Sequence, residues 1–282
     1  MGYRDLYFTQ PNLTTSTKGR RLLVFGVPYD GTSSFRPGSR FGPSAFRHTY
    51  WNIELYDPVL KRDAEEVPVE DMGDLSTVGP ADYMVDAVKK VVKEAVEGGN
   101  VPAMVGGEHT LTYGSGLALP DTVTLLVFDA HLDFRDELYG LKLSHGTFLR
   151  RLLEARQLDV IHVGARAASK KEWEDARKAM TVLAGHENWF EKLAEELEKV
   201  EKVYVSLDLD VLDPAFAPGV GNPKAGGISS NELLRTLYLL KGKEVVGFDL
   251  TELCPPYDNG AAASIACKAF SILAILSGVE NA

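Results

Sequence analysis

Acidic and histidine residues gather in three short runs, each directly after an apolar segment that has the composition of a β-strand. The runs are residues 106–109 (Gly-Gly-Glu-His), 129–133 (Asp-Ala-His-Leu-Asp) and 208–210 (Asp-Leu-Asp). A fourth apolar segment is followed by Glu252. Because ligands of open α/β sheets bind beyond the carboxyl ends of the strands, we expect these side chains to meet at one edge of a sheet.

The spacing of these residues predicts a metal centre. Alternate residues of an extended segment share a face, so Asp129, His131 and Asp133 should point one way, and so should Asp208 and Asp210. A buried group of so many carboxylates is tolerable when divalent cations fill it. The mixture of carboxylate and imidazole favours Mn²⁺ over Ca²⁺ or thiolate-bound Zn²⁺. The set is too large for one catalytic ion and suits two. The predicted ligands are His109, Asp129, His131, Asp133, Asp208 and Asp210.

The remaining histidines and Glu108 are not predicted to bind the metal directly. In an extended segment Glu108 would face away from His109, so we interpret it as a support for the ligands. His48, His162 and His186 belong to no motif and are interpreted as structural or surface residues.

The elements that must position these residues alternate between strand and helix. The predicted strands are residues 21–27, 65–71, 101–105, 122–128, 158–164, 181–184, 202–208 and 245–250. The predicted helices are residues 81–98, 188–200, 229–240 and 261–277. Several strands are apolar on both faces, which is typical of a parallel sheet covered by helices. We therefore expect one doubly wound α/β domain over residues 1–282, with about eight mostly parallel strands. Residues 28–43, rich in Gly, Ser and Pro, predict a long loop over one face.

Composition excludes several classes of partner. The chain has 30 Lys and Arg against 40 Asp and Glu, a formal charge of −10, which argues against binding to nucleic acid or an anionic membrane. The two cysteines, Cys254 and Cys267, form no disulfide framework, and the first residues lack the pattern of a signal peptide. The apolar stretch 261–277 is short for a membrane span and contains Lys268. We expect a cytoplasmic protein.

The motifs together resemble a known family. Residues 106–109 (GGEH), 129–133 (DAHLD) and 206–219 (SLDLDVLDPAFAPG) resemble the three signatures of the arginase/agmatinase ureohydrolases. Residues 144–148 (SHGTF) resemble the histidine segment of agmatinase-like members, and residues 36–43 (RPGSRFGP) resemble their N-terminal loop. The resemblance implies the three-layer arginase-like α/β fold and a homo-oligomer, either a trimer or a hexamer.

The resemblance also implies a role for each motif residue. Two Mn²⁺ ions per chain would be held, one by His109, Asp129, Asp133 and Asp208, the other by Asp129, His131, Asp208 and Asp210. His145 matches the histidine that carries protons near the mouth of the cleft, and Glu252 matches the glutamate that pairs with the substrate guanidinium. The expected reaction is hydrolysis of agmatine to urea and putrescine. A hydroxide between the ions would attack the guanidinium carbon, and Asp133 would pass a proton to the leaving amine.

Three residues depart from the family pattern and bear on the substrate. Asn222 stands where the family has Thr, and as a polar side chain it is assigned to substrate binding. Phe134 follows Asp133 where arginases carry Asn, and a phenyl ring cannot hydrogen-bond an α-carboxylate, which argues against arginine. Arg135 could meet a carboxylate if it turns inward, which keeps an acidic substrate open.

Other functions remain to be compared with hydrolysis of agmatine. Within the same chemistry, the substrate could be N1-aminopropylagmatine, a guanidino acid or arginine. A two-metal phosphoesterase would require Lys or Arg to hold phosphate, and Arg135 alone lies within a motif. A non-catalytic metal-binding homologue would have no need of His145 and Glu252 beside a complete set of ligands.

Overall fold

The centre of the molecule is a nine-stranded sheet. The computed structural model describes residues 7–8, 13–16, 18–77, 79–184 and 188–280. The strand order is β1-β5-β2-β6-β11-β10-β7-β8-β9, and every neighbouring pair is parallel except β1 with β5. The strands are β1 (Tyr7–Phe8), β2 (Leu22–Gly26), β5 (Val69–Leu75), β6 (Val101–Val105), β7 (Thr124–Phe128), β8 (Val160–Val163), β9 (Thr181–Leu183), β10 (Lys202–Asp208) and β11 (Glu244–Thr251). The expected sheet of about eight mostly parallel strands is confirmed.

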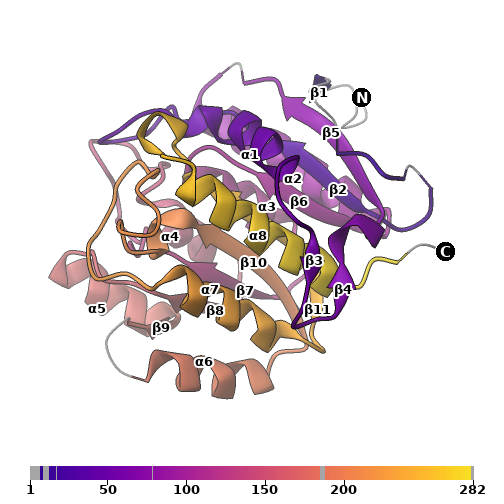
Figure 1. Ribbon diagram of the computed structural model, residues 1–282. Coiled ribbons are helices and arrows are strands. Elements are labelled where there is room, and N and C mark those ends of the chain that lie inside the picture. Colours follow the sequence, from indigo (N-terminus) through magenta and orange to yellow (C-terminus); the bar gives the residue numbers. More distant parts are fainter. Residues whose placement is uncertain (1–6, 9–12, 17, 78, 185–187, 281–282) are drawn as a thin grey trace.

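Helices cover both faces of this sheet. They are α1 (Gly42–Tyr50), α2 (Ala81–Glu97), α3 (Thr112–Ala118), α4 (Phe148–Ala155), α5 (Lys170–Ala179), α6 (Trp189–Glu198), α7 (Ser230–Leu237) and α8 (Ala261–Leu276). In Figure 1, α1, α7 and α8 lie in front of the sheet, and α2 lies behind it. A short hairpin, β3 (Tyr56–Asp57) with β4 (Arg62–Asp63), stands apart from the main sheet.

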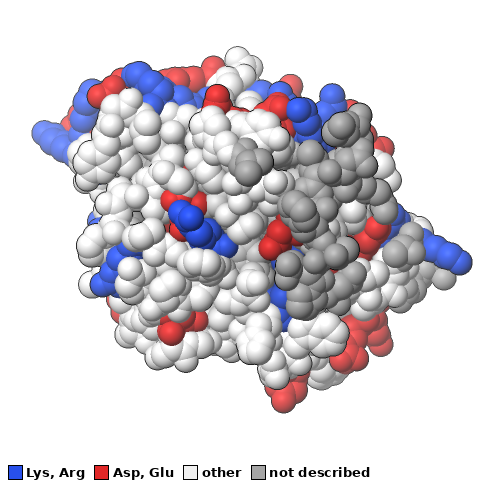
Figure 2. Space-filling model, turned by 90° about the horizontal axis from the view of Figure 1, so that it is seen from above, with Lys and Arg blue, Asp and Glu red and all other residues white. Residues whose placement is uncertain are grey.

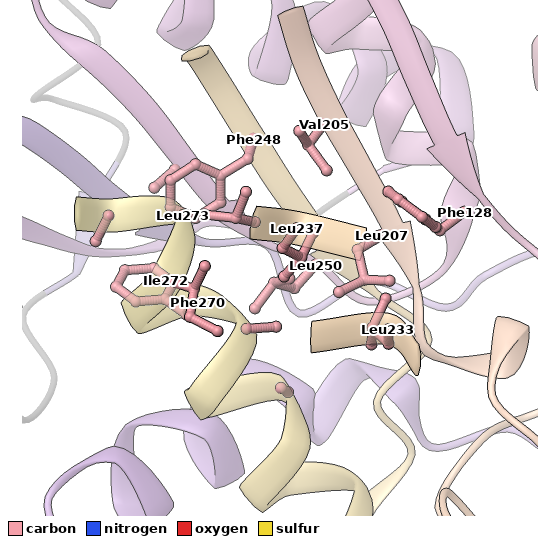
Figure 3. Close-up of a cluster of buried hydrophobic side chains, with 14 of the residues drawn as sticks. Phe128, Val205, Leu207, Leu233, Leu237, Phe248, Leu250, Phe270, Ile272 and Leu273 are labelled. Atoms are coloured by element: carbon pink, nitrogen blue, oxygen red, sulfur yellow. The ribbon is translucent and has the colours of Figure 1, made fainter. Parts of the chain in front are cut away.

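The apolar core has a part on each face of the sheet, because successive residues of a strand point to opposite faces. In β2, Leu22 and Val24 pack into the core under α1, α6, α7 and α8, whereas Phe25 packs against α2 on the opposite face. Figure 3 shows the first core, where Phe248 and Leu250 of β11 meet Phe270 of α8. Because both faces of the central strands are covered, most of the residues in these strands are apolar.

Helix α8 is buried and closes this core. Most of its residues are buried, and Lys268 places Nζ 2.9 Å from Oδ2 of the buried Asp57. The ion pair gives the single lysine of this helix an acidic partner. In the described part of the chain, no helix combines the length and the apolar character that a membrane crossing needs.

Some element boundaries differ from the expectation. The strand predicted at 65–71 lies at Val69–Leu75, because residues Ala64–Glu66 form a 3₁₀ turn capped by the Asp63 side chain. The long loop ends earlier than residue 43, since a 3₁₀ turn at Ser39–Phe41 leads directly into α1. Helices α1, α3, α4 and α5 were not predicted.

Charged side chains of both signs are interspersed on the face shown in Figure 2, with wide uncharged areas between them. Among the described residues on this face, Lys and Arg form no continuous basic surface.

Candidate active site

The predicted site residues come together at the carboxyl ends of four neighbouring strands. Strands β6, β11, β10 and β7 are adjacent in the sheet, and the acidic and histidine runs follow them. One pocket is lined by the predicted residues His109, His131, Asp133, His145, Asp208, Asp210, Asn222 and Glu252. Asp129 is fully buried and contacts both His109 and His131. The sheet topology therefore gathers residues that are up to 143 positions apart in the chain.

A first cluster forms around His109. Its Nδ1 lies 3.0 Å from Oδ2 of Asp129, 3.4 Å from Oδ2 of Asp133 and 3.3 Å from Oδ2 of Asp208. His109 sits in the 3₁₀ turn His109–Leu111 that follows β6. Three carboxylates thus converge on one imidazole nitrogen in a fully buried position.

A second cluster forms around His131. Its Nδ1 lies 2.8 Å from Oδ2 of Asp210 and 3.5 Å from Oδ1 of Asp129. Asp129 therefore takes part in both clusters, through one oxygen in each. Asp208 contacts the first cluster, and its Oδ1 accepts a hydrogen bond from the backbone N–H of Asp210 at 2.7 Å. A shared role for Asp208 remains a prediction.

The local backbone differs from the extended segments that the sequence suggested. Asp133 has a left-handed φ of 48°, so strict alternation along 129–133 does not hold. Asp208 ends β10, and Asp210 belongs to the 3₁₀ turn Leu209–Val211 that follows. The side chains still converge, because these turns bend the chain at the sheet edge where the pocket opens.

The electrostatics of the two clusters are those of buried, mutually dependent groups. Burial disfavours protonated His109 and His131, but the neighbouring aspartates outweigh it and raise the pKa of each ring well above its usual value. Burial and the adjacent carboxylates raise the pKa of Asp133 and of Asp208 well above the usual range. Although burial raises it, the two histidines hold the pKa of Asp129 well below that range.

The donor set fits divalent cations. Among the described residues, no Lys or Arg forms an ion pair with the four aspartates of the clusters. An ion with bonds of about 2.0–2.2 Å holds neighbouring donor atoms about 3 Å apart, which is close to the separations around His109. Two groups, His109 with Asp129 and Asp133, and Asp129 with His131 and Asp210, have ligand atoms within 4.8 Å of one another. The clusters therefore form a candidate binuclear metal site.

Buried hydrogen bonds orient His109 from behind. Its Nε2 lies 2.9 Å from Oγ of Ser206, and that hydroxyl donates to Oδ1 of Asp249 at 2.6 Å. Such partners fix the ring orientation of a metal-binding histidine. Ser206 and Asp249 were missed from the sequence. Each is a polar residue within a mostly apolar strand, and this pattern could have indicated them. Ser206 stands two positions before Asp208, and Asp249 stands three positions before Glu252.

Glu252 is held by the backbone at Gly107 and His109. Its Oε1 accepts a hydrogen bond from the N–H of His109 at 3.0 Å, and its own N–H donates to the carbonyl of Gly107 at 2.8 Å. Its φ of 63° is left-handed, so the chain turns sharply after β11. A Cβ at Gly221 would lie 3.2 Å from Oε2, so the glycine keeps this oxygen uncrowded. Burial and the charges of Glu108 and Asp210 raise the pKa of Glu252 well above its usual value.

His145 faces the pocket from the turn before α4. Its Nδ1 lies 3.2 Å from Oγ1 of Thr32, and its Nε2 lies 3.0 Å from Oγ of Ser34. Both partners belong to the loop that was predicted to cover one face. Burial, followed by the charge of His131, lowers the pKa of His145 to about 4. Nothing in the sequence indicated Thr32 or Ser34 individually.

The residues without motifs lie outside the clusters. His48 is exposed on α1, and His162 is buried within β8, while His186 lies outside the described residues. Glu108 is buried and hydrogen-bonds the side chains of Thr32 and Thr110.

Two of the three residues that depart from the family pattern, Asn222 and Arg135, line the pocket. Asn222 lines it, and its Oδ1 accepts a hydrogen bond from Nζ of Lys224 at 2.9 Å. Arg135 also lines it, with Nε 3.4 Å from Oε2 of the buried Glu172. Phe134 packs into the core beside α4, with Cζ of Arg150 5.7 Å from the centroid of its ring.

Comparison with known proteins agrees with this geometry. The model of the arginase family matches residues 20–275. An agmatinase from Bacillus anthracis is 37% identical over 259 residues, which cover 88% of this chain and 89% of that protein. An N(1)-aminopropylagmatine ureohydrolase from Thermococcus kodakarensis is 34% identical over 83% of this chain and 82% of its own.

A solved structure shows the same fold. The agmatine ureohydrolase of Thermoplasma volcanium superposes with a TM-score of 0.87 at 33% identity, covering 96% of this chain and 95% of that one. Sequence, fold and the arrangement of the aspartate and histidine clusters lead to the same conclusion: this chain belongs to the arginase family.

Proposed function

We propose that this protein is a Mn²⁺-dependent ureohydrolase that converts agmatine to urea and putrescine. The observation that carries the proposal is the pair of clusters around His109 and His131, joined by Asp129, with Glu252 on the same pocket. The relatives named agmatinase and agmatine ureohydrolase support the choice of substrate.

The proposed ligands divide between two ions. Asp129 and Asp208 would be shared, His109 and Asp133 would complete one site, and His131 and Asp210 the other. The carboxylate and imidazole donors suit Mn²⁺. Two bound ions would lower the pKa of a water molecule to about 7 and so supply the nucleophile.

The protein residues bind the substrate and move its protons. Glu252 would hold the planar guanidinium through charge-assisted hydrogen bonds, since a carboxylate matches the fork of N–H donors. Asp133 would pass a proton to the leaving amine nitrogen, because its carboxylate lines the pocket beside His109. His145 would exchange protons between pocket and solvent. Asn222 would contact the substrate near the guanidinium end.

The tail of the substrate is proposed to be cationic. Phe134 gives an α-carboxylate no partner, and the protein carries a formal charge of −10. The relative named N(1)-aminopropylagmatine ureohydrolase makes the aminopropylated tail the first alternative. A guanidino acid would need Arg135 to leave Glu172 and face the pocket.

We further propose a single-domain subunit that assembles as a homotrimer or hexamer in the cytoplasm. Both cysteines are free and buried, which suits a reducing compartment.

The decisive experiment is a urea-release assay over a guanidino panel, with and without added Mn²⁺. The panel contains agmatine, N1-aminopropylagmatine, 4-guanidinobutyrate and arginine, with a phosphomonoester assayed in parallel. Urea from agmatine that requires Mn²⁺ is the expected result. Phosphate release without urea would favour the phosphoesterase, and no turnover with metal bound would favour the non-catalytic homologue.

A further inference from the structure

We propose that Glu108 sets the tautomer of His145 through Thr32, so that Nε2 of His145 is the ring nitrogen free to accept a proton in the pocket. Glu108 is thus a positioning residue, because it acts on the site through another side chain. The proposal deepens the proposed function and rests on it for the role of His145 as a proton carrier.

The chain of hydrogen bonds begins at a buried carboxylate that accepts three hydrogen bonds. Glu108 is fully buried, and its Oε1 accepts from Oγ1 of Thr32 at 2.6 Å and from Oγ1 of Thr110 at 2.5 Å. Its Oε2 accepts from the backbone N–H of Thr32 at 2.7 Å. Both threonine hydroxyls therefore donate their single proton to this carboxylate.

This arrangement uses the only hydroxyl proton of Thr32. Its oxygen can then act towards His145 only as an acceptor. It accepts from the backbone N–H of His145 at 3.1 Å, and it lies 3.2 Å from Nδ1 of the same residue. A favourable contact at that distance requires the proton to be on Nδ1. The same hydroxyl group therefore holds the histidine backbone and orients its ring.

The consequence appears at the other ring nitrogen. A neutral imidazole carries one N–H, and the hydrogen bond of one nitrogen decides the state of the other. Burial lowers the pKa of His145 to about 4, so the ring is neutral at neutral pH. With the proton on Nδ1, Nε2 has a free lone pair, and its neighbour is the hydroxyl of Ser34 at 3.0 Å on the pocket wall.

The side chain at position 108 is therefore specific. A glutamine in its place would keep the shape, but its NH₂ group would donate. With the glutamine oxygen accepting from the Thr32 N–H, the NH₂ group would face the two threonine hydroxyls. The Thr32 hydroxyl would then turn to donate to Nδ1 of His145, and the ring proton would move to Nε2.

The test is ¹⁵N NMR of the histidine ring nitrogens, on the metal-free protein and on protein loaded with diamagnetic Zn²⁺. Loss of signals in His145→Ala assigns the ring. We expect Nδ1–H in the unmodified protein and in Thr32→Ser, which keeps the hydroxyl. In Glu108→Gln we expect the Nε2–H tautomer to dominate. Thr32→Val lacks the hydroxyl, so we expect it to lose the preference for Nδ1–H.

Kinetics provide the second measurement. Glu108→Gln and Thr32→Val should lower kcat for urea release roughly tenfold or more while KM and bound Mn²⁺ stay the same, since general acid–base groups contribute about 10²–10⁴-fold. Thr32→Ser should restore most of kcat.

Two results would overturn the proposal: Nε2–H in the unmodified protein, or an unchanged tautomer in both Glu108→Gln and Thr32→Val. If Glu108→Gln does not fold, Thr32→Val and Thr32→Ser decide the question. The NMR measurement needs no substrate, so an inactive protein with the expected tautomers would refute the proposed function and leave this inference intact.

Discussion

Glu252 accepts a hydrogen bond from the backbone N–H of His109, with 3.0 Å between nitrogen and Oε1, although 143 residues separate the two in the chain. This contact ties the proposed guanidinium-binding carboxylate to the turn that carries His109, a proposed metal ligand. The position of the substrate and the position of the metal cluster are therefore set by the same short segment.

Replacing Glu252 by Gln should weaken every guanidino substrate by a similar factor. The substitution keeps the shape and removes the charge, and hydrogen bonds to charged groups contribute about 1.5–3 kcal/mol, so kcat/KM should fall about 10-fold to 150-fold. Steady-state kinetics over the guanidino panel measure this, with Glu97→Gln on the exposed end of α2 as the control. If the variant keeps its overall activity but changes its preference among substrate tails, Glu252 contacts the tail and not the guanidinium, and the assignment is wrong.

Asp129→Ala should abolish binding of both metal ions, because Asp129 is the carboxylate within reach of both histidines. Metal analysis after loading with Mn²⁺ should approach two equivalents for the unmodified protein and fall towards none for the variant. Asp210→Ala is the matched control, since Asp210 belongs to the second cluster, and it should retain about one equivalent. Asp208→Ala tests the shared role proposed for that residue, which predicts loss at both sites. One tightly held ion that survives Asp129→Ala would refute the binuclear centre.

His145→Ala should lower kcat and leave the metal content unchanged. The side chain contacts Thr32 and Ser34 and is not among the residues of the two clusters. Loss of a proton-transfer group costs about 10²–10⁴-fold in rate. The comparison is with His48→Ala on the exposed side of α1, which should behave as the unmodified protein. Loss of metal in His145→Ala would reassign His145 as a ligand.

Arg47→Met should destabilise the fold strongly without touching the pocket. The buried guanidinium of Arg47 lies 2.8 Å from Asp71 and 2.5 Å from Asp74, and it also donates to the carbonyl of Gly73. Removing one partner of a buried ion pair costs roughly 3–5 kcal/mol, because the buried carboxylate of Asp71 and the partly buried one of Asp74 lose their cationic partner.

Thermal and denaturant unfolding measure this cost. Lys90→Ala, which breaks the exposed pair with Asp86, should leave the midpoint nearly unchanged. Equal midpoints for the two variants would show that the Arg47 cluster contributes no more than a surface pair.

Agmatine, or its aminopropylated form, should have a higher kcat/KM than arginine or 4-guanidinobutyrate. A substrate carboxylate left without a partner costs about 1–3 kcal/mol, which corresponds to about 5-fold to 150-fold discrimination. Arg135→Ala separates the alternatives, because it should leave agmatine hydrolysis unchanged and reduce activity on 4-guanidinobutyrate if Arg135 receives an acidic tail. Arginine as the best substrate would contradict the assignment of the pocket mouth.

The sequence alone was sufficient for the class of fold and for the candidate ligands. The predominantly apolar runs 101–105 and 202–208 match their strands, because a strand buried on both faces is made mostly of apolar residues. The runs that end in His109, Asp133 and Asp210 were recognised because acidic and histidine residues at strand ends are rarely needed for packing alone. Both signals are local, and a local pattern can be found without knowing the fold.

The tertiary structure decided how these residues meet. Segments that are distant in the chain meet through the hydrogen bond from His109 to Glu252 and through the hydrogen bonds that link Glu108, Thr32 and His145. The left-handed turns at Asp133 and Glu252 direct these segments towards the pocket. Their geometry depends on strand order and on where each turn leaves the sheet. The spacing of neighbouring residues encodes neither the strand order nor the direction of each turn. Packing of the whole sheet with its helices brings distant strand ends within hydrogen-bonding distance.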